Sequence, residues 1–161
     1  MARAVTGAEG PGKVTLRLLR EGEEPVGSSS VWDDWGERDA PQPAGLGRMV
    51  VELDGEPVGD VSWHSVWYGP NEGSRALNIG IALHASARGR GVGSRAQRML
   101  AEHLFATTAV ERIEASTDVA NAAEQRALDK AGFTREGVLR SLLEFEGRRH
   151  DLESWSLLPG E

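Results

Sequence analysis

The sequence contains no cysteine among its 161 residues. This absence excludes disulfide bonds, a thiolate nucleophile and cysteine-ligated metal sites. No apolar run follows Met1, and no stretch approaches the roughly 20 apolar residues of a membrane span. We therefore expect a cytoplasmic protein without a signal peptide, a membrane partner or a bound metal.

Basic residues are fewer than acidic ones. The sequence has 18 Lys and Arg residues and 25 Asp and Glu residues, which gives a net charge of −7. This balance argues against a general nucleic-acid binder and favours a cationic partner such as an amine. A chain of this length suits one domain, which can bury roughly 70% of its unfolded surface. We expect a flexible tail over residues 1–13, which show no periodicity, and a single domain over residues 14–161.

An alternating stretch over residues 75–83 is the first strong signal. One face is apolar and carries Leu77, Ile79, Ile81 and Leu83. The other face is nearly bare and carries Ala76, Asn78, Gly80 and Ala82. The pattern predicts a strand with one face in the core and a backbone that a ligand can approach closely on the other.

A glycine-rich loop and a helix follow this strand. Gly89, Gly91 and Gly93 recur at every second position, and residues 88–98 hold four arginines and no acid. Glycine places no Cβ between its amide and a ligand, and the first turn of a helix offers free N–H groups. This arrangement predicts an anion site, most often for phosphate. The P-loop motif is absent, and the glycines are one residue too closely spaced for a Rossmann fingerprint.

Two motifs carry a family resemblance. Arg88-Gly89-Arg90-Gly91-Val92-Gly93 resembles the Q/R-x-x-G-x-G/A pyrophosphate loop of the GNAT superfamily of N-acetyltransferases. Residues 121–133, Asn-Ala-Ala-Glu-Gln-Arg-Ala-Leu-Asp-Lys-Ala-Gly-Phe, resemble the N-x-x-S/A…E-K-x-G-F segment of the same family. Order and spacing fit, and the branch most similar is that of the RimJ/RimL-type ribosomal-protein N-terminal acetyltransferases. The likeness runs from about residue 14 to residue 158.

The resemblance implies an α/β (α+β) GNAT fold, with a mixed, mostly antiparallel central sheet of six to seven strands, splayed at the cofactor site and flanked by helices. It implies transfer of an acetyl group from acetyl-CoA to a primary amine: an N-terminal α-amine, an amino acid, or a small amine-bearing metabolite or antibiotic. A homodimer is left open. The residues it places on the cofactor are Ile81, Ala82, Leu83, Arg88, Gly89, Arg90, Gly91, Val92, Gly93, Ser94, Asn121 and Lys130.

The seven strands that we expect follow from alternation and turn signals. They cover residues 14–18, 48–53, 58–67, 75–83, 110–117, 138–145 and 149–158.

The sequence departs from the family at the catalytic positions. Asn78 stands where many relatives have a glutamate base, and asparagine cannot accept a proton. Leu128 stands where many relatives have a tyrosine acid, and Glu124 where this branch often has serine. An N-terminal α-amine has a pKa near 7.7–8.0, against about 10.4 for lysine, so it needs less help to become neutral. The missing base therefore favours an α-amine or another amine of low pKa.

Four candidates for the base remain: His64, Glu124, Asp60 and water. Asp60, Ser62 and His64 share one face of the strand over residues 58–67, opposite Val61 and Trp63. Side chains two apart on a strand lie roughly 6.5 Å apart, which is too far for a direct hydrogen bond, so these three do not form a triad. The polar face either meets solvent or contacts substrate, and His64 is the first choice for the base, with Glu124 second.

The irregular stretch over residues 21–45 carries Trp32, Asp33 and Trp35. It is either a solvated loop with aromatic side chains against the core or a cover over the acceptor. With Asp60 and Asn78, these three residues make up the candidate substrate contacts. Asn121 can also be interpreted in two ways. It is a natural helix N-cap with Glu124 at the capping-box position. The family resemblance implies that it is a ligand of the cofactor.

Two functions remain open. The first is direct acetyl transfer in a ternary complex, since no cysteine can carry the acyl group. The alternative is an acyl-CoA-binding sensor or self-resistance module of the same fold with little turnover, which the absent base and tyrosine permit. Measuring thiol release with a panel of amines separates the two.

Overall fold

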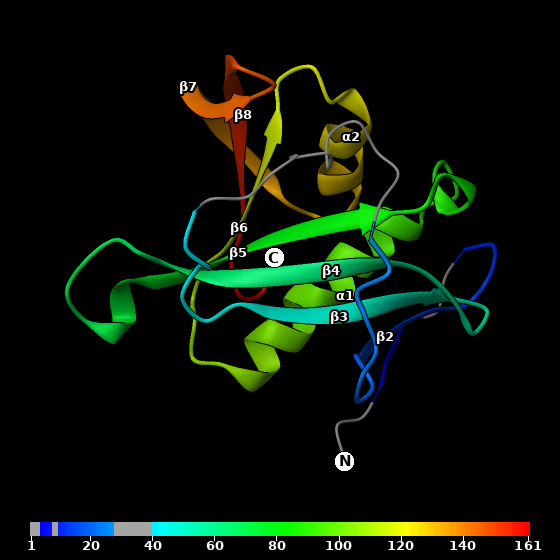
Figure 1. The fold of residues 1–161 in the computed structure, drawn as a ribbon. Coiled ribbons are helices and arrows are strands. Elements are labelled where there is room, and N and C mark those ends of the chain that lie inside the picture. The colour runs from blue at the N-terminus through cyan, green and yellow to red at the C-terminus, as the bar shows by residue number, and fades with distance from the viewer. Residues whose placement is uncertain (1–3, 8–9, 28–39) are drawn as a thin grey trace.

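The computed structural model describes residues 4–7, 10–27 and 40–161, which form one eight-stranded sheet with helices packed on it (Figure 1). The strands are β1 (Val5–Gly7), β2 (Val14–Leu18), β3 (Gly47–Leu53), β4 (Glu56–Trp67), β5 (Arg75–Leu83), β6 (Ile113–Asp118), β7 (Thr134–Phe145) and β8 (Arg148–Leu157). The helices are η1 (Glu72–Ser74), η2 (Ala85–Ala87), α1 (Val92–Thr107) and α2 (Ala122–Lys130). The expected mixed fold is confirmed, with one strand more than expected.

The strand order is β1-β2-β3-β4-β5-β6-β8-β7, and among the described strands only the β5–β6 pair is parallel. This pair is also short. Register partners join residues 77–79 of β5 to residues 113–115 of β6, and none follows. Beyond that point β5 stays paired with β4, and β6 with β8. The sheet therefore divides into a proximal arm, β4–β5, and a distal arm, β6–β8, which splay apart toward the ends of β5 and β6 (Figure 1).

The additional strand is β1, and it lies inside the tail expected over residues 1–13. It pairs antiparallel with β2, from Val5 opposite Leu16 to Gly7 opposite Val14. Gly7 also lies close to α1, since a Cβ there would come within 2.7 Å of the Met99 sulfur. Residues 5–7 thus belong to the sheet. A three-residue strand is too short to show periodicity, which is why sequence pattern missed it.

The core lies between the sheet and α1, which covers the face opposite the viewer in Figure 1. The alternation in β5 places Leu77 and Ile79 in this core, as expected. α1 buries Ala96, Leu100 and Leu104 at helical spacing against them. α2 adds Leu128 to the same cluster. Both α-helices therefore use one side of the sheet, which leaves the polar side chains of β4, β5 and β6 on the other.

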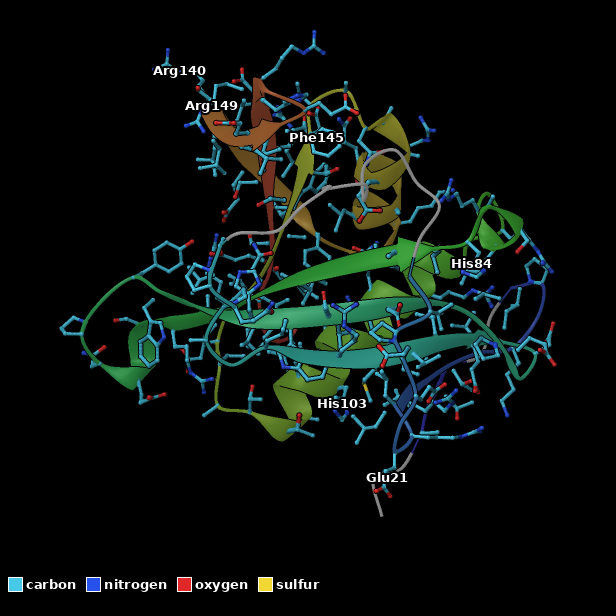
Figure 2. All side chains as sticks on the ribbon, in the orientation of Figure 1. Glu21, His84, His103, Arg140, Phe145 and Arg149 are labelled. Carbon is cyan, nitrogen blue, oxygen red and sulfur yellow. The ribbon has the colours of Figure 1, made fainter. Side chains whose placement is uncertain are left out.

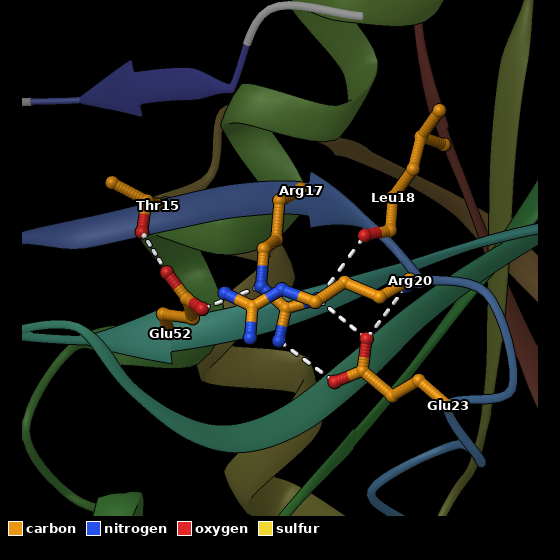
Figure 3. A network of polar contacts seen from close by, with 6 residues as sticks. All are labelled: Thr15, Arg17, Leu18, Arg20, Glu23 and Glu52. Carbon is orange, nitrogen blue, oxygen red and sulfur yellow. Dashed lines mark hydrogen bonds and ion pairs between the residues drawn. The ribbon is translucent and has the colours of Figure 1, made fainter.

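The segment after β2 crosses this polar face (Figure 1) and is fixed by Arg17 (Figure 3). The Arg17 guanidinium bonds Glu52 of β3 at 2.5 Å and Glu23 of the segment at 2.7 Å. This arrangement holds the pKa of Glu23 down at about 2 and raises the pKa of Arg17. Further along, the Gly27 amide donates to Asp60 Oδ2 at 2.6 Å. The segment over residues 20–27, which we call the strap, is thus fastened to the sheet at both ends.

Turn signals in the sequence, Asp54-Gly55 and Glu146-Gly147, predict two hairpins between neighbouring strands, and the structure contains both. Asp54 and Gly55 join β3 to β4 with φ of 53° and 87°, and Glu146 and Gly147 join β7 to β8 with φ of 50° and 70°. Positive φ at both central residues matches the strand twist, which is why Asp-Gly and similar pairs predict such turns. In the part of the chain that the structure describes, no helix is long and apolar enough to cross a membrane.

Candidate active site

The glycine-rich loop leads directly into α1. Gly89 and Gly91 both adopt the left-handed region, each with φ of 70°, and Gly91 is the N-cap of α1. A Cβ on either residue would project into open space, with no heavy atom within 4 Å. Gly93, in the first turn of α1, is more crowded. A Cβ placed on it would lie 3.6 Å from the Leu83 side chain of β5 and 3.9 Å from the Ala127 side chain of α2. The loop thus presents bare backbone beside a helix N-terminus, which is a geometry suited to an anion.

The arginines around this loop have different partners. Arg88 donates to the Leu83 carbonyl at 2.8 Å, and Arg95 donates to the carbonyl of Gly12 at 2.7 Å. Arg98 bonds Glu102 at 2.8 Å and the Glu161 carbonyl at 2.9 Å, so it faces the C-terminus and not the loop. The Arg90 guanidinium makes no hydrogen bond or ion pair with any described residue and is exposed. Arg90 is therefore the arginine best placed to meet a bound phosphate.

The splay between β5 and β6 begins beside the loop. Residues 80–83 of β5 have β4 on one side and no described strand on the other, and they include the predicted cofactor residues Ile81, Ala82 and Leu83. Gly80 is exposed, and a Cβ there would touch only Ser62 Oγ, at 3.3 Å. An extended chain can lie against such a strand and use its backbone groups as an added strand would.

Asn121 caps α2 as the sequence predicts. Its side-chain Oδ1 accepts a hydrogen bond from the Glu124 amide at 3.3 Å. The Asn121 amide donates to the Asp118 carbonyl, so the reciprocal half of a capping box is made by backbone. This cap stands at the end of β6, on the distal arm of the splay. Lys130 is exposed in the last turn of the same helix.

A row of polar side chains crosses the face of the sheet that the strap covers. The register places His64 of β4 opposite Asn78 of β5, and Asn78 opposite Glu114 of β6. His64 is half-buried, and its ring forms no hydrogen bond with a described residue. Burial lowers the pKa of His64 below its ordinary 6.5, against a smaller opposing effect of Glu114. At neutral pH its imidazole is therefore mostly unprotonated and able to accept a proton.

Asp60 lies on the same face, opposite Ala82, and is 1% exposed. Its Oδ2 accepts the strap amide, whereas its Oδ1 is buried and makes no hydrogen bond with a described residue. His84, at the end of β5 (Figure 2), also meets the strap, with its Nε2 3.3 Å from the Val26 carbonyl. The candidate substrate residues Trp32, Asp33 and Trp35 lie outside the described residues.

Two polar groups of the distal arm were missed by sequence reasoning. Glu114 is buried and bonds Tyr68 at 2.8 Å and Arg112 at 2.5 Å. Tyr68 has its pKa raised, first by burial and then by this bond. At the other end of β6, Asp118 Oδ2 bonds His150 Nδ1 of β8 at 2.6 Å. Glu114, Ser116 and Asp118 alternate with Ile113, Ala115 and Thr117, which could have indicated a polar strand face, but nothing local marks His150.

Comparisons with known proteins agree with this geometry. Residues 14–134 match the family described as an acetyltransferase (GNAT) domain. The chain therefore belongs to the GNAT acetyltransferase family. It is 29% identical over 108 residues to a putative ribosomal N-acetyltransferase, YdaF of Bacillus subtilis, covering 67% of this chain and 57% of that one. It is 31% identical over 80 residues to a probable N-acetyltransferase, YjcK of the same organism, covering 50% and 44%.

Among solved structures, RimJ of Mycobacterium smegmatis in complex with a CoA-disulfide matches with a TM-score of 0.69 at 24% identity, covering 92% of this chain and 83% of that one. RimL, a ribosomal L7/L12 α-N-protein acetyltransferase in complex with coenzyme A, matches with a TM-score of 0.62 at 22% identity, covering 70% and 62%. These structures show the shared fold. The matched stretch spans 44% to 61% of the length of the curated relatives.

Proposed function

We propose that this protein is an N-acetyltransferase that moves an acetyl group from acetyl-CoA directly to a primary amine. The observation that carries the proposal is the continuity of the Gly89–Gly91 loop, the N-terminus of α1 and the splay between β5 and β6. The loop and helix suit a pyrophosphate, and the splay suits the extended arm that follows it. The acidic balance of the chain, at −7, favours a cationic acceptor.

Acetyl-CoA supplies the activated acetyl group. The amides of residues 88–94 would hold its pyrophosphate, with Arg90 adding charge. The backbone of Ile81, Ala82 and Leu83 and the Asn121 side chain would line the splay, and Lys130, exposed in the last turn of α2, would add a further contact to the cofactor. An N–H near Ile81 or Ala82 serves as an oxyanion donor, and such a group contributes roughly 3 kcal/mol.

His64 is the proposed base, because it lies on the polar face of the sheet opposite Asn78 of β5 and burial lowers its pKa. Glu124 is the second candidate, at the start of α2. The acceptor is an N-terminal α-amine, an amino acid or a small amine-bearing compound. The name of one neighbour, a ribosomal L7/L12 α-N-protein acetyltransferase, supports an N-terminal α-amine as the acceptor. Another neighbour is a microcin C7 self-immunity acetyltransferase.

The alternative is a sensor or self-resistance module that binds acyl-CoA with little turnover. It is favoured by Asn78 and Leu128, which replace the base and acid found in many relatives. The test measures thiol release from acetyl-CoA with the peptide Ser-Ala-Ala-Lys, n-butylamine, spermidine and an amine-bearing antibiotic. Turnover of at least one amine well above hydrolysis supports the transferase. Tight acetyl-CoA binding without release on any of them supports the alternative.

A further inference from the structure

Glu114 of β6 is a buried carboxylate to which the proposed function assigns no role. It is 6% exposed and lies on the polar face of the sheet, where β5 and β6 are still paired. Both of its oxygens have partners, because the Tyr68 hydroxyl donates to Oε2 at 2.8 Å and Arg112 donates to Oε1 at 2.5 Å. Burying a charged group costs free energy, so a carboxylate at this position requires an explanation.

The cluster around Glu114 keeps an excess of negative charge, although Arg112 binds it. The two Nη groups of Arg112 also donate to the carboxylate of Glu136 on β7, and this bond is the main cause that lowers the pKa of Glu136. One guanidinium is therefore shared between two carboxylates. Tyr68 adds no charge at neutral pH, because its pKa is raised, first by burial.

The register places this charge two strands from His64. His64 of β4 is opposite Asn78 of β5, and Asn78 is opposite Glu114. Neighbouring strands lie about 4.8 Å apart, so β4 and β6 are roughly 10 Å apart at this point. Only the neutral Asn78 stands between His64 and Glu114 in the row. The carboxylate that the sequence lacks at position 78 is thus present one strand further, at position 114.

Other charged groups near His64 act on it less than Glu114 does. On this face, β3, β4 and the strap carry Arg48, which is opposite Ser62, Asp60, and the cluster of Arg17, Glu23 and Glu52. β5 adds no charge, because Asn78, Gly80 and Ala82 are neutral. Among the charged groups of the described chain, Glu114 is the one whose charge raises the pKa of His64, against the larger lowering by burial.

We propose that Glu114 is a positioning residue for the base, and that its carboxylate stabilises the imidazolium formed when His64 accepts a proton from the attacking amine. In this step the amine nitrogen bonds the acetyl carbon and gives one proton to the ring. The carbon–sulfur bond breaks, its electron pair leaves with the thiolate, and the ring then passes the proton to the thiolate or to water. A negative charge that is already fixed in a buried site needs no rearrangement as the ring becomes positive. This inference rests on the proposed acetyltransferase function, with His64 as its base.

The first test measures the pKa of His64 and needs no turnover. Nitrogen-15 spectra of the histidine side chains, titrated across the acidic and neutral range, give this pKa, and His64→Ala assigns the resonance. We expect the pKa to fall by about 0.5 to 1 unit in Glu114→Gln, which removes one charge at roughly 10 Å and keeps an acceptor for Tyr68. Arg112→Gln removes the cation that the two carboxylates share, so it should raise the pKa of His64. These opposite signs keep the test decisive if one variant fails to fold.

Glu111→Gln is the matched control for charge. Glu111 is exposed and lies just before β6, so this variant makes the same change in net charge and should leave the pKa of His64 unchanged. Tyr68→Phe is the control for packing, because it removes one hydrogen bond to Glu114 and keeps the charge. The same fall in the pKa of His64 in Tyr68→Phe and in Glu114→Gln would contradict an effect of charge.

The second test follows kcat/KM for the peptide Ser-Ala-Ala-Lys against pH. In Glu114→Gln the acidic limb should move to lower pH by the same amount as the pKa of His64, because a weaker base becomes protonated only at lower pH. At the plateau, kcat should fall about two- to fivefold, since part of the positive charge has reached the ring in the transition state. KM for acetyl-CoA should stay unchanged, because the cluster acts through His64.

The outcomes are distinguishable. Thiol release together with an unchanged pKa of His64 in both Glu114→Gln and Arg112→Gln would overturn this inference and leave the acetyltransferase function standing. A lowered pKa with an unmoved acidic limb would also overturn it, because His64 would then not be the base. No thiol release with any amine would overturn the function and this inference with it.

Discussion

Gly91 sets both the shape of the loop and the start of α1, and a side chain there meets two obstacles. Its φ of 70° lies in the left-handed region, and its Cβ would project into the open space in front of the helix N-terminus. We expect Gly91→Val to lose most of its affinity for CoA in calorimetry. Left-handed backbone at a residue other than glycine also costs about 1–3 kcal/mol of stability.

Gly147→Val is the control for that strain. Gly147 has the same φ of 70° and open surroundings, but it lies in the β7–β8 turn. This variant should lose similar stability and keep full affinity for CoA. Equal affinities of the two variants would argue against the loop as the pyrophosphate site.

Asn121 separates a capping role from a binding role. Its Oδ1 accepts the Glu124 amide, and aspartate caps as well as asparagine. Asn121→Asp should therefore keep the melting temperature without ligand, while affinity for CoA falls because the amide N–H group is replaced by a negative charge. Asn121→Ala, which loses the cap, should cost roughly 1 kcal/mol of stability. Unchanged CoA affinity in Asn121→Asp would leave the residue as a cap alone.

His64 has a pH signature. Burial lowers its pKa below 6.5, so kcat/KM should fall only on the acidic side of that value, as the ring becomes protonated. If His64 is the base, His64→Ala should lower kcat/KM by roughly 10²-fold or more and remove this acidic limb. A variant with near wild-type kcat/KM at pH 7 and the same acidic limb would leave water as the proton acceptor.

At the scale of elements, the Arg17–Glu23 ion pair holds the strap, and protonation of Glu23 at low pH should break this pair. The Glu23 pKa is about 2, against an ordinary 4.5, and the bond from Arg17 is the main cause. A depressed carboxyl pKa contributes stability that is present above pH 4.5 and is lost as the pH falls toward 2. We expect Glu23→Gln to lower the melting temperature slightly at pH 7, and the difference from wild type to shrink below pH 4.5.

Glu24→Gln is the matched control, because Glu24 is exposed and bonds no described residue. It makes the same change in net charge and should leave the melting temperature unchanged at both pH values. A pH-independent difference in Glu23→Gln would show that the Arg17 contact does not hold the strap.

Some elements of the fold and the site could be predicted from the sequence, whereas others could not. The alternation of β5 and the spacing of Gly89 and Gly91 are local, and they predicted a strand and a glycine-rich loop leading into a helix, both of which the structure contains. The Asp118–His150 pair joins residues 32 apart and exists only because β8 pairs with β6 in one register. No local pattern encodes that register. The partnerless Asp60 oxygen is likewise a property of packing, since sequence shows a carboxylate but not what surrounds it.

At the scale of the whole molecule, the cofactor should join the two arms. The loop and β5 belong to the proximal arm, whereas β6 and the Asn121 cap belong to the distal arm, and no register pair links the arms beyond Ile79 and Ala115. A ligand that bridges them stabilises the folded state by about 2.7 kcal/mol at 100 times its Kd. For a chain of this size, that corresponds to a rise in melting temperature of roughly 5–10 °C.

Hydrogen exchange tests where that stabilisation acts. With CoA present, we expect slower exchange in three places: residues 88–94, residues 80–83 of β5 and residues 116–118 of β6. Adenosine 3′-phosphate 5′-diphosphate, which keeps the pyrophosphate and lacks the pantetheine arm, should protect the loop but not the two strand ends. Protection by CoA that is confined to the loop would mean that the splay does not receive the cofactor arm. Because β5 and β6 already lack a common ladder beyond residue 79, protection of both strand ends by CoA would have to come from the bound arm itself.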